Sequence, residues 1–182
     1  MVDKEKDKKD DKDKKSTKDQ DSKEVAAKDR PILVAVDFSD DSKAAFTWAC
    51  EAATAFGAPI VLFHVVHEPA EAPGYYRHDI KDKMRPMEDV AEKMMRKFLK
   101  ERSDANPHNK SLKNLKTQLV TGLPVTRVLK AADKVNARMI VMGSQGRSGL
   151  AHLLVGSKAE QVVRMAKIPV TIVKATRENN ED

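Results

Sequence analysis

Short apolar runs alternate with segments of helical periodicity along most of this chain. Branched aliphatic residues dominate the runs, which is typical of strands buried on both faces, and the segments between them carry apolar residues at three- and four-residue spacing. The predicted strands are 32–36, 60–66, 115–120, 139–142 and 170–174; the predicted helices are 42–56, one opening at Pro86, one opening at Pro124, and 157–166. This alternation predicts a doubly wound α/β domain, Rossmann-like, with a five-stranded parallel sheet and helices on both faces.

The first 30 residues differ from the rest in composition. They hold eleven Lys or Arg, ten Asp or Glu and no aromatic residue. Such a segment cannot bury enough apolar surface to offset the entropy of ordering, so we expect a disordered charged tail at 1–30, a domain at 31–175 and a C-terminal tail at 176–182. A nucleic-acid arm or nuclear signal is the alternative, but interleaved aspartates cancel the field that phosphates would feel, which argues against a nucleic-acid partner.

Cysteine and histidine usage indicates the compartment and argues against a metal cluster. The single cysteine, Cys50, excludes an internal disulfide and suits a reducing compartment, where it is a helical core filler rather than a nucleophile. We find no signal-peptide stretch and no run long enough to cross a membrane, and therefore expect a cytoplasmic protein, with nuclear entry left open. A strand would turn His64 and His67 to opposite faces, so a shared metal is not expected.

Glycines cluster after the fourth predicted strand. Four of the seven glycines of the chain lie within 143–156, and a helical pattern begins at Ser157. Glycine lets another group approach the backbone closely, and the amides of such a loop and of the following helix form an anion site suited to phosphate, to which Arg147 could add charge. The spacing fits neither the Walker pattern nor Gly-x-Gly-x-x-Gly, and a turn without a ligand is the alternative.

Asp37 follows the first predicted strand. In doubly wound sheets, ligands lie outside the carboxyl ends of the strands, at the point where the strand order reverses. If the first and fourth strands are neighbours there, Asp37 and the glycine loop line one crevice. The Asp37 carboxylate repels phosphate and is better suited to ribose hydroxyls, an adenine amino group or a magnesium ion. Together these features predict a nucleotide site.

The spacing Gly143-x-x-Gly146, nine further residues, then Gly156-Ser157 resembles the nucleotide-binding signature of the ATP-binding subclass of the universal stress protein family. Val36-Asp37-Phe38-Ser39 resembles the first strand and turn of that family, His64-Val65 the end of its second strand, and 168–173 its closing strand. The resemblance covers about residues 31–175 and implies the strand order 3-2-1-4-5.

The resemblance also implies a ligand and the residues that hold it. The ligand would be ATP, with magnesium at Asp37 as an option. In the family pattern, Ala35, Val36 and Asp37 approach the adenosine, Val65 packs near adenine, Met142 and Gly143 border the ribose and phosphates, and Gly146, Arg147, Gly156, Ser157 and Lys158 hold the phosphate chain. The charged tail and the long loop at 67–85 depart from this pattern, and the loop could provide a lid or a partner site.

The last predicted strand has an apolar edge formed by Val170, Ile172 and Val173. Family members commonly dimerise through this strand, and a partner strand would cover the edge, which implies a homodimer. An edge guarded by Lys174 and the C-terminal tail is the alternative.

The function implied is a nucleotide-dependent stress-response or signalling protein with an unidentified protein partner. Its ATP hydrolysis would be at most slow, because only Asp37 and the weaker candidate His152 offer a base for water. Two alternatives stay open. One is an adenine-nucleotide enzyme of the ATP pyrophosphatase or adenylyl transferase type on the same fold, and the other is a chaperone-like interaction protein.

Overall fold

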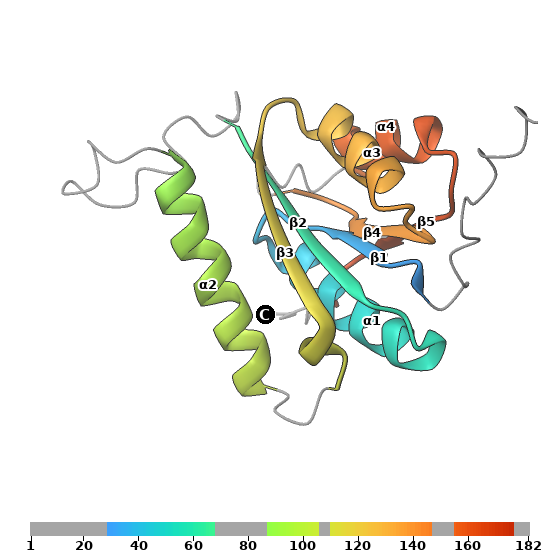
Figure 1. Ribbon diagram of the computed structural model, residues 1–182. Helices are drawn as coiled ribbons and strands as arrows, with labels where there is room; N and C mark the ends of the chain where they lie inside the picture. The colour runs from blue at the N-terminus through green and yellow to red at the C-terminus, as the bar shows by residue number, and fades with distance from the viewer. Residues whose placement is uncertain (1–28, 68–86, 106–109, 147–154, 177–182) are drawn as a thin grey trace, which may run out of the picture.

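The computed structural model describes residues 29–67, 87–105, 110–146 and 155–176 (Figure 1). The predicted N-terminal tail apart from its last two residues, the loop at 67–85 apart from His67, and Arg147 lie outside the described residues. What was predicted of them stays a prediction.

Five strands form one parallel sheet in the order β3-β2-β1-β4-β5, as predicted. The strands are β1 (Ile32–Ala35), β2 (Ile60–Val66), β3 (Leu115–Thr121), β4 (Met139–Gly143) and β5 (Val170–Val173). β1 lies at the centre and pairs with both β2 and β4, so that Ala35 is opposite Phe63 on one side and Met142 on the other. The first and fourth strands are therefore neighbours, and the strand order reverses between them.

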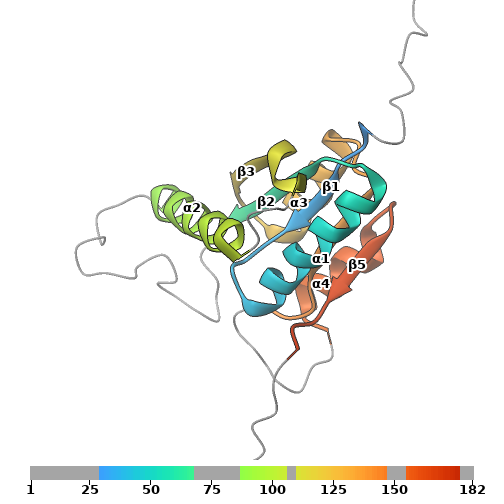
Figure 2. The same ribbon diagram turned by 90° about the horizontal axis from the view of Figure 1, so that it is seen from below.

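Helices cover both faces of the sheet. They are α1 (Asp40–Phe56), α2 (Met87–Ala105), α3 (Pro124–Lys134) and α4 (Ser157–Met165), with a short 3-10 helix at Lys110–Asn114. α3 and α4 lie together on one face, while α1 and α2 lie on the other (Figures 1 and 2). Ile32 and Val34 of β1 point into the cluster beneath α1 and α2, whereas Leu33 between them points into the cluster beneath α3 and α4. None of the helices in the described ranges is long and apolar enough to span a bilayer.

α1 begins two residues before the predicted start. The Ser39 hydroxyl accepts a hydrogen bond from the backbone N–H of Ser42 and caps the helix, which adds Asp40 and Asp41 to its first turn. Gly57 ends the helix with a φ of 62°, a left-handed conformation that glycine adopts without strain. On the inner side, Phe46 packs edge to face against Phe98 of α2 at 5.4 Å between ring centroids.

β3 lies at the edge of the sheet, as the predicted strand order requires. Leu115 and Leu119 are partly buried, whereas Thr117 between them is exposed. Leu119 packs against the cluster of Val90 and Ala91 from α2, and Leu115 packs against the larger cluster beneath α1 and α2. The short 3-10 helix that leads into the strand was not predicted.

The carboxyl end of β4 packs closely against the first turn of α1. A Cβ atom at Gly143 would lie 2.9 Å from the backbone carbon of Asp41 and 2.9 Å from the backbone nitrogen of Ser42. Those atoms belong to a helical turn and cannot move aside independently. Glycine at position 143 is therefore required by the packing of strand on helix, whatever the loop binds.

This contact predicts that Gly143→Ala destabilises the protein. The added methyl group overpacks the strand end against helix backbone, and we expect a loss of about 1–3 kcal/mol in the free energy of unfolding, measured by urea denaturation. Gly156→Ala is the matched control. Gly156 has a φ of −69°, and a Cβ there would lie 3.3 Å from the Ser144 carbonyl oxygen. The loss in the free energy of unfolding should therefore be smaller for this variant. Equal losses in the two variants would contradict the packing argument.

Candidate functional site

Two segments meet where β1 and β4 end. Asp37 follows β1, and Gly146 lies three residues beyond the end of β4. A Cβ at Gly146 would lie 2.9 Å from Oδ2 of Asp37, which shows how closely the two segments approach each other. The structure thus brings Asp37 and the start of the glycine loop to one place at the carboxyl edge of the sheet.

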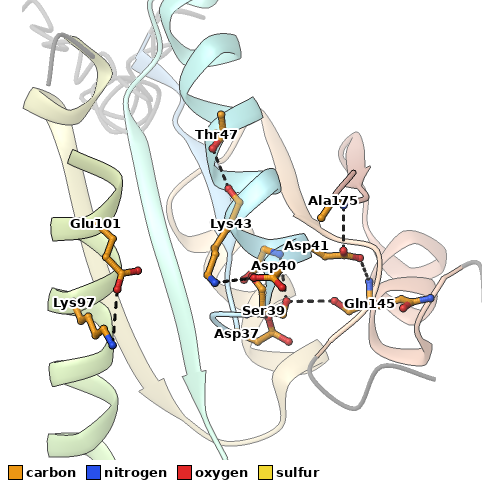
Figure 3. Close-up of polar contacts among 11 residues, drawn as sticks. Asp37, Ser39, Asp40, Asp41, Lys43, Thr47, Lys97, Glu101, Gln145 and Ala175 are labelled. Atoms are coloured by element: carbon orange, nitrogen blue, oxygen red, sulfur yellow. Dashed lines mark hydrogen bonds and ion pairs between the residues drawn. The ribbon is translucent and has the colours of Figure 1, made fainter. Parts of the chain in front are cut away.

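A compact turn fixes Asp37. Its Oδ1 accepts hydrogen bonds from both the backbone N–H of Ser39, at 3.0 Å, and the Ser39 hydroxyl, at 2.5 Å (Figure 3). Ser39 is also the residue that caps α1. The Asp37 carboxylate is therefore oriented by the same residue that caps α1. This fixes the position of the carboxylate relative to the start of the helix.

Phe38 in this turn has an unusual backbone conformation. Its φ is 66°, a region that costs energy for a residue with a bulky side chain. The ring is buried and packs on the His64 ring at 4.4 Å between centroids, and a ring nitrogen of His64 lies 2.7 Å from the Val36 carbonyl oxygen. Because a carbonyl only accepts, that nitrogen, Nδ1, carries the proton. Burial of the Phe38 ring therefore offsets the backbone strain and shapes the turn that carries Asp37.

Asp41 holds the start of the loop, and sequence reasoning missed it. This side chain is buried at 4% exposure, and its Oδ2 accepts from the Ser144 hydroxyl at 2.6 Å and from the Gln145 backbone N–H at 2.9 Å. The predicted helix at 42–56 left Asp41 outside the helix. A usable signal was present, because Asp41 precedes Ala45 and Ala49 at four-residue spacing and so continues the apolar stripe of α1.

The far side of the glycine loop opens α4. Gly156 is the N-cap of this helix and makes no side-chain cap hydrogen bond, while its backbone N–H donates to the Ser144 carbonyl at 2.7 Å. Ser157 and Lys158 follow in the first turn and are exposed. Because the N-cap residue is a glycine, it has no side chain to cover the first amides of α4, and such amides favour an anion.

Lys158 reaches across to the end of β2. Its Nζ lies 3.3 Å from Nε2 of His67, whose Nδ1 lies 3.1 Å from the Val65 carbonyl oxygen. Nδ1 donates to the carbonyl, so Nε2 of a neutral imidazole can accept from the ammonium group. His67 entered the sequence analysis only as a poor metal candidate, and its pairing with Lys158 depends on a contact between residues 91 positions apart.

The remaining predicted residues lie at the same strand ends. Val36 and Val65 are buried at 5% and 6% exposure, and Ala35 and Met142 are partly buried and adjacent in the sheet. In the described part of the chain, no group of three or more His, Cys, Asp or Glu side chains could hold a metal ion. We use the name carboxyl-edge site for Asp37, Gly146, Gly156, Ser157 and Lys158.

Comparison with known proteins identifies relatives among the universal stress proteins. A universal stress protein of Thermus aquaticus is 29% identical over 147 residues, which cover 80% of this chain and 98% of that protein. One from Methanocaldococcus jannaschii is 41% identical over 58 residues, covering 32% of this chain and 34% of that protein. The chain spans about half of the length, 48%, of a universal stress protein of Mycobacterium tuberculosis.

Solved structures share the fold. The universal stress protein UspA of Lactobacillus plantarum superposes with a TM-score of 0.60 at 26% identity, covering 79% of this chain and 97% of that one. A universal stress protein in complex with cAMP gives a TM-score of 0.55 at 24% identity, covering 81% and 98%. The model of the universal stress protein family matches residues 29–174. With the predicted strand order present and most of the chain matched, this chain belongs to the universal stress protein family.

Proposed function

We propose that this protein binds an adenine nucleotide, ATP foremost, at the carboxyl-edge site, and serves as a nucleotide-dependent stress-response or signalling protein. The observation that carries the proposal is the start of α4, which has no side-chain cap and lies on the same loop as Gly146, beside the Asp37 carboxylate. Family membership supports it, and a relative with this fold is known in complex with cAMP. An unidentified protein partner would distinguish the nucleotide-bound protein from the nucleotide-free protein.

The phosphate chain would lie at the α4 end of the site. The first amides of α4 point out of the helix N-terminus, and the helix dipole adds positive potential there. Lys158 is exposed in this first turn and can supply an ammonium group. Gly146 has no side chain, so phosphate oxygens can approach its backbone. Arg147 is proposed to add charge, although it lies outside the described residues.

The nucleoside would lie at the β1 end. Asp37 offers carboxylate oxygens to hydroxyl or amino groups, and a ribose provides such donors. Ala35, Val36, Val65, Met142 and Gly143 would surround the adenosine with apolar atoms and backbone. Magnesium, when bound, would neutralise phosphate charge. It would take its ligands mainly from the nucleotide and water, with Asp37 as the protein group suited to reach it.

The proposal predicts that Gly146→Val abolishes ATP binding. A valine side chain would occupy the space toward Asp37 and block the approach of phosphate to the backbone. We expect the wild-type protein to bind ATP in isothermal titration calorimetry, and the variant to lose at least tenfold in affinity with an unchanged far-UV spectrum.

Mass spectrometry of small molecules released by denaturing the purified protein provides an independent check on the ligand. GTP serves as the control nucleotide. A wild-type protein that neither carries nor takes up an adenine nucleotide would refute the proposal. A Gly146→Val variant with full affinity would show that the phosphates lie elsewhere.

A charge-matched pair of variants tests the α4 end. We expect Lys158→Met to raise the Kd for ATP about fivefold, corresponding to about 1 kcal/mol for one charge-assisted contact, and to weaken the dependence of Kd on salt. Lys43→Met removes the same charge from the first turns of α1, where Lys43 pairs with Asp40 at 2.7 Å. The Lys43→Met variant should bind ATP as the wild type does. Similar losses in both variants would indicate a general effect of net charge.

We also propose a homodimer through β5. Val170, Ile172 and Val173 are partly buried on this edge strand, and Val163 and Met165 of α4 are 47% and 61% exposed. On the inner side of the strand, the Pro169 carbonyl accepts from Ile140 of β4, and the Val173 carbonyl accepts from Ser144 just beyond β4. Backbone groups alternate along a strand, so Ile172 directs its N–H to the open side, where a second chain can pair with it.

The dimer predicts that Ile172→Pro gives a monomer. Proline removes the outward N–H and is tolerated on an edge strand, because no hydrogen bond to β4 is lost. Sedimentation velocity should show a dimer for the wild type and for Ile172→Val, and a monomer for Ile172→Pro with its fold retained by circular dichroism. A wild-type protein that sediments as a monomer at 100 µM would exclude this interface; we choose about that concentration because weak homodimers populate there.

A further inference from the structure

We propose that Asp41 is a positioning residue that couples the glycine loop to the chain leaving β5. Groups bound at the loop and contacts made at the β5 edge would then influence each other through one buried carboxylate. The part of this inference that involves a nucleotide rests on the proposed function, whereas the coupling within the protein does not.

The carboxylate joins two strand ends. Oδ2 receives the Ser144 hydroxyl and the Gln145 N–H, both just beyond β4, while Oδ1 receives the Ala175 backbone N–H at 3.1 Å, just beyond β5. Figure 3 shows Asp41 between Ala175 and Gln145. The donors lie 103 to 134 positions away from Asp41 in the sequence, so one side chain of α1 fixes the exits of two neighbouring strands.

Ser144 extends the connection to α4. Its backbone N–H donates to the Val173 carbonyl at 2.8 Å, and its own carbonyl accepts from the Gly156 N–H at 2.7 Å. The Ser144 hydroxyl also donates to Asp41, so Ser144 makes hydrogen bonds to β5, to α1 and to the N-cap of α4. A shift at the start of α4 reaches the end of β5 through two hydrogen bonds.

Neighbouring Asp40 shows that Asp41 does more than favour a helix N-terminus. Both residues stand in the first turn of α1, where an acid interacts well with the helix dipole. The Asp40 side chain is 82% exposed and pairs with Lys43. Asp41 is buried, and all three of its hydrogen-bond partners described above donate, so both of its oxygens act as acceptors. Burying a carboxylate is costly without such donors, and a second acid in this turn would not need to be buried to serve the dipole.

A rigid carboxylate transmits changes because its two oxygens move together. If a ligand draws the loop outward, Oδ2 follows its two donors and Oδ1 turns relative to Ala175. If a partner strand moves the end of β5, the same rotation acts on the loop in reverse. Thermodynamic linkage requires the effect to be equal in both directions.

The first experiment needs no ligand and measures amide hydrogen exchange by NMR at Gln145 and Ala175. We expect Ser144→Ala, a change on the loop side, to raise the exchange rate at Ala175 at least threefold. In an Asp41→Asn background the same change should have no further effect on Ala175, because the connection is already broken. Asp40→Asn is the matched control, since it removes one acid from the same turn, and it should leave both amides unchanged.

Unchanged exchange at Ala175 in Ser144→Ala would overturn the inference. If Asp41→Asn does not fold, Ser144→Ala still decides, because it keeps the carboxylate. In the second experiment, ATP should slow exchange at Ala175 in the wild type and not in Asp41→Asn. A wild type that does not bind ATP refutes the proposed function alone, whereas a wild type that binds ATP with no change at Ala175 refutes the coupling.

Discussion

The pairing of β1 with both β2 and β4 is the interaction on which the rest of the structure depends. It places the carboxyl end of β1 between those of its two neighbours, so the turn after β1 faces the loop after β4. Asp37, Gly146 and Lys158 then come to one edge although they lie far apart in the sequence. A strand order in which β1 and β4 are not neighbours would separate them.

Glycine suits the three positions of the signature for different physical reasons. Gly143 lets the end of β4 approach the backbone of α1 and belongs to the packing of the domain. Gly146 leaves open the space next to Asp37, and Gly156 begins α4 without a side-chain cap. The spacing of the motif is thus partly a packing requirement. A loss of function after mutation of Gly143 would therefore say little about ligand contact unless stability were measured as well.

The fold could be predicted from the sequence because each strand is a continuous apolar run and each helix has a periodic apolar stripe. Family spacing then supplied the strand order, which alternation alone does not determine. The roles of Asp41 and the pairing of Lys158 with His67 could not be predicted, since their partners are chosen by tertiary structure.

Two acidic side chains, Asp37 and Asp41, lie next to the proposed phosphate site, and their environments differ. The charge of Asp41 is directed at three donors within the protein and lies on the far side of the loop backbone from solvent. Asp37 is partly exposed and follows β1, and its Oδ2 lies 2.9 Å from the position that a Cβ atom at Gly146 would occupy. In the proposed complex, repulsion by Asp37 and attraction by α4 and Lys158 would act in the same direction on a nucleotide. Together they would orient it with its phosphates over α4 and its nucleoside over β1.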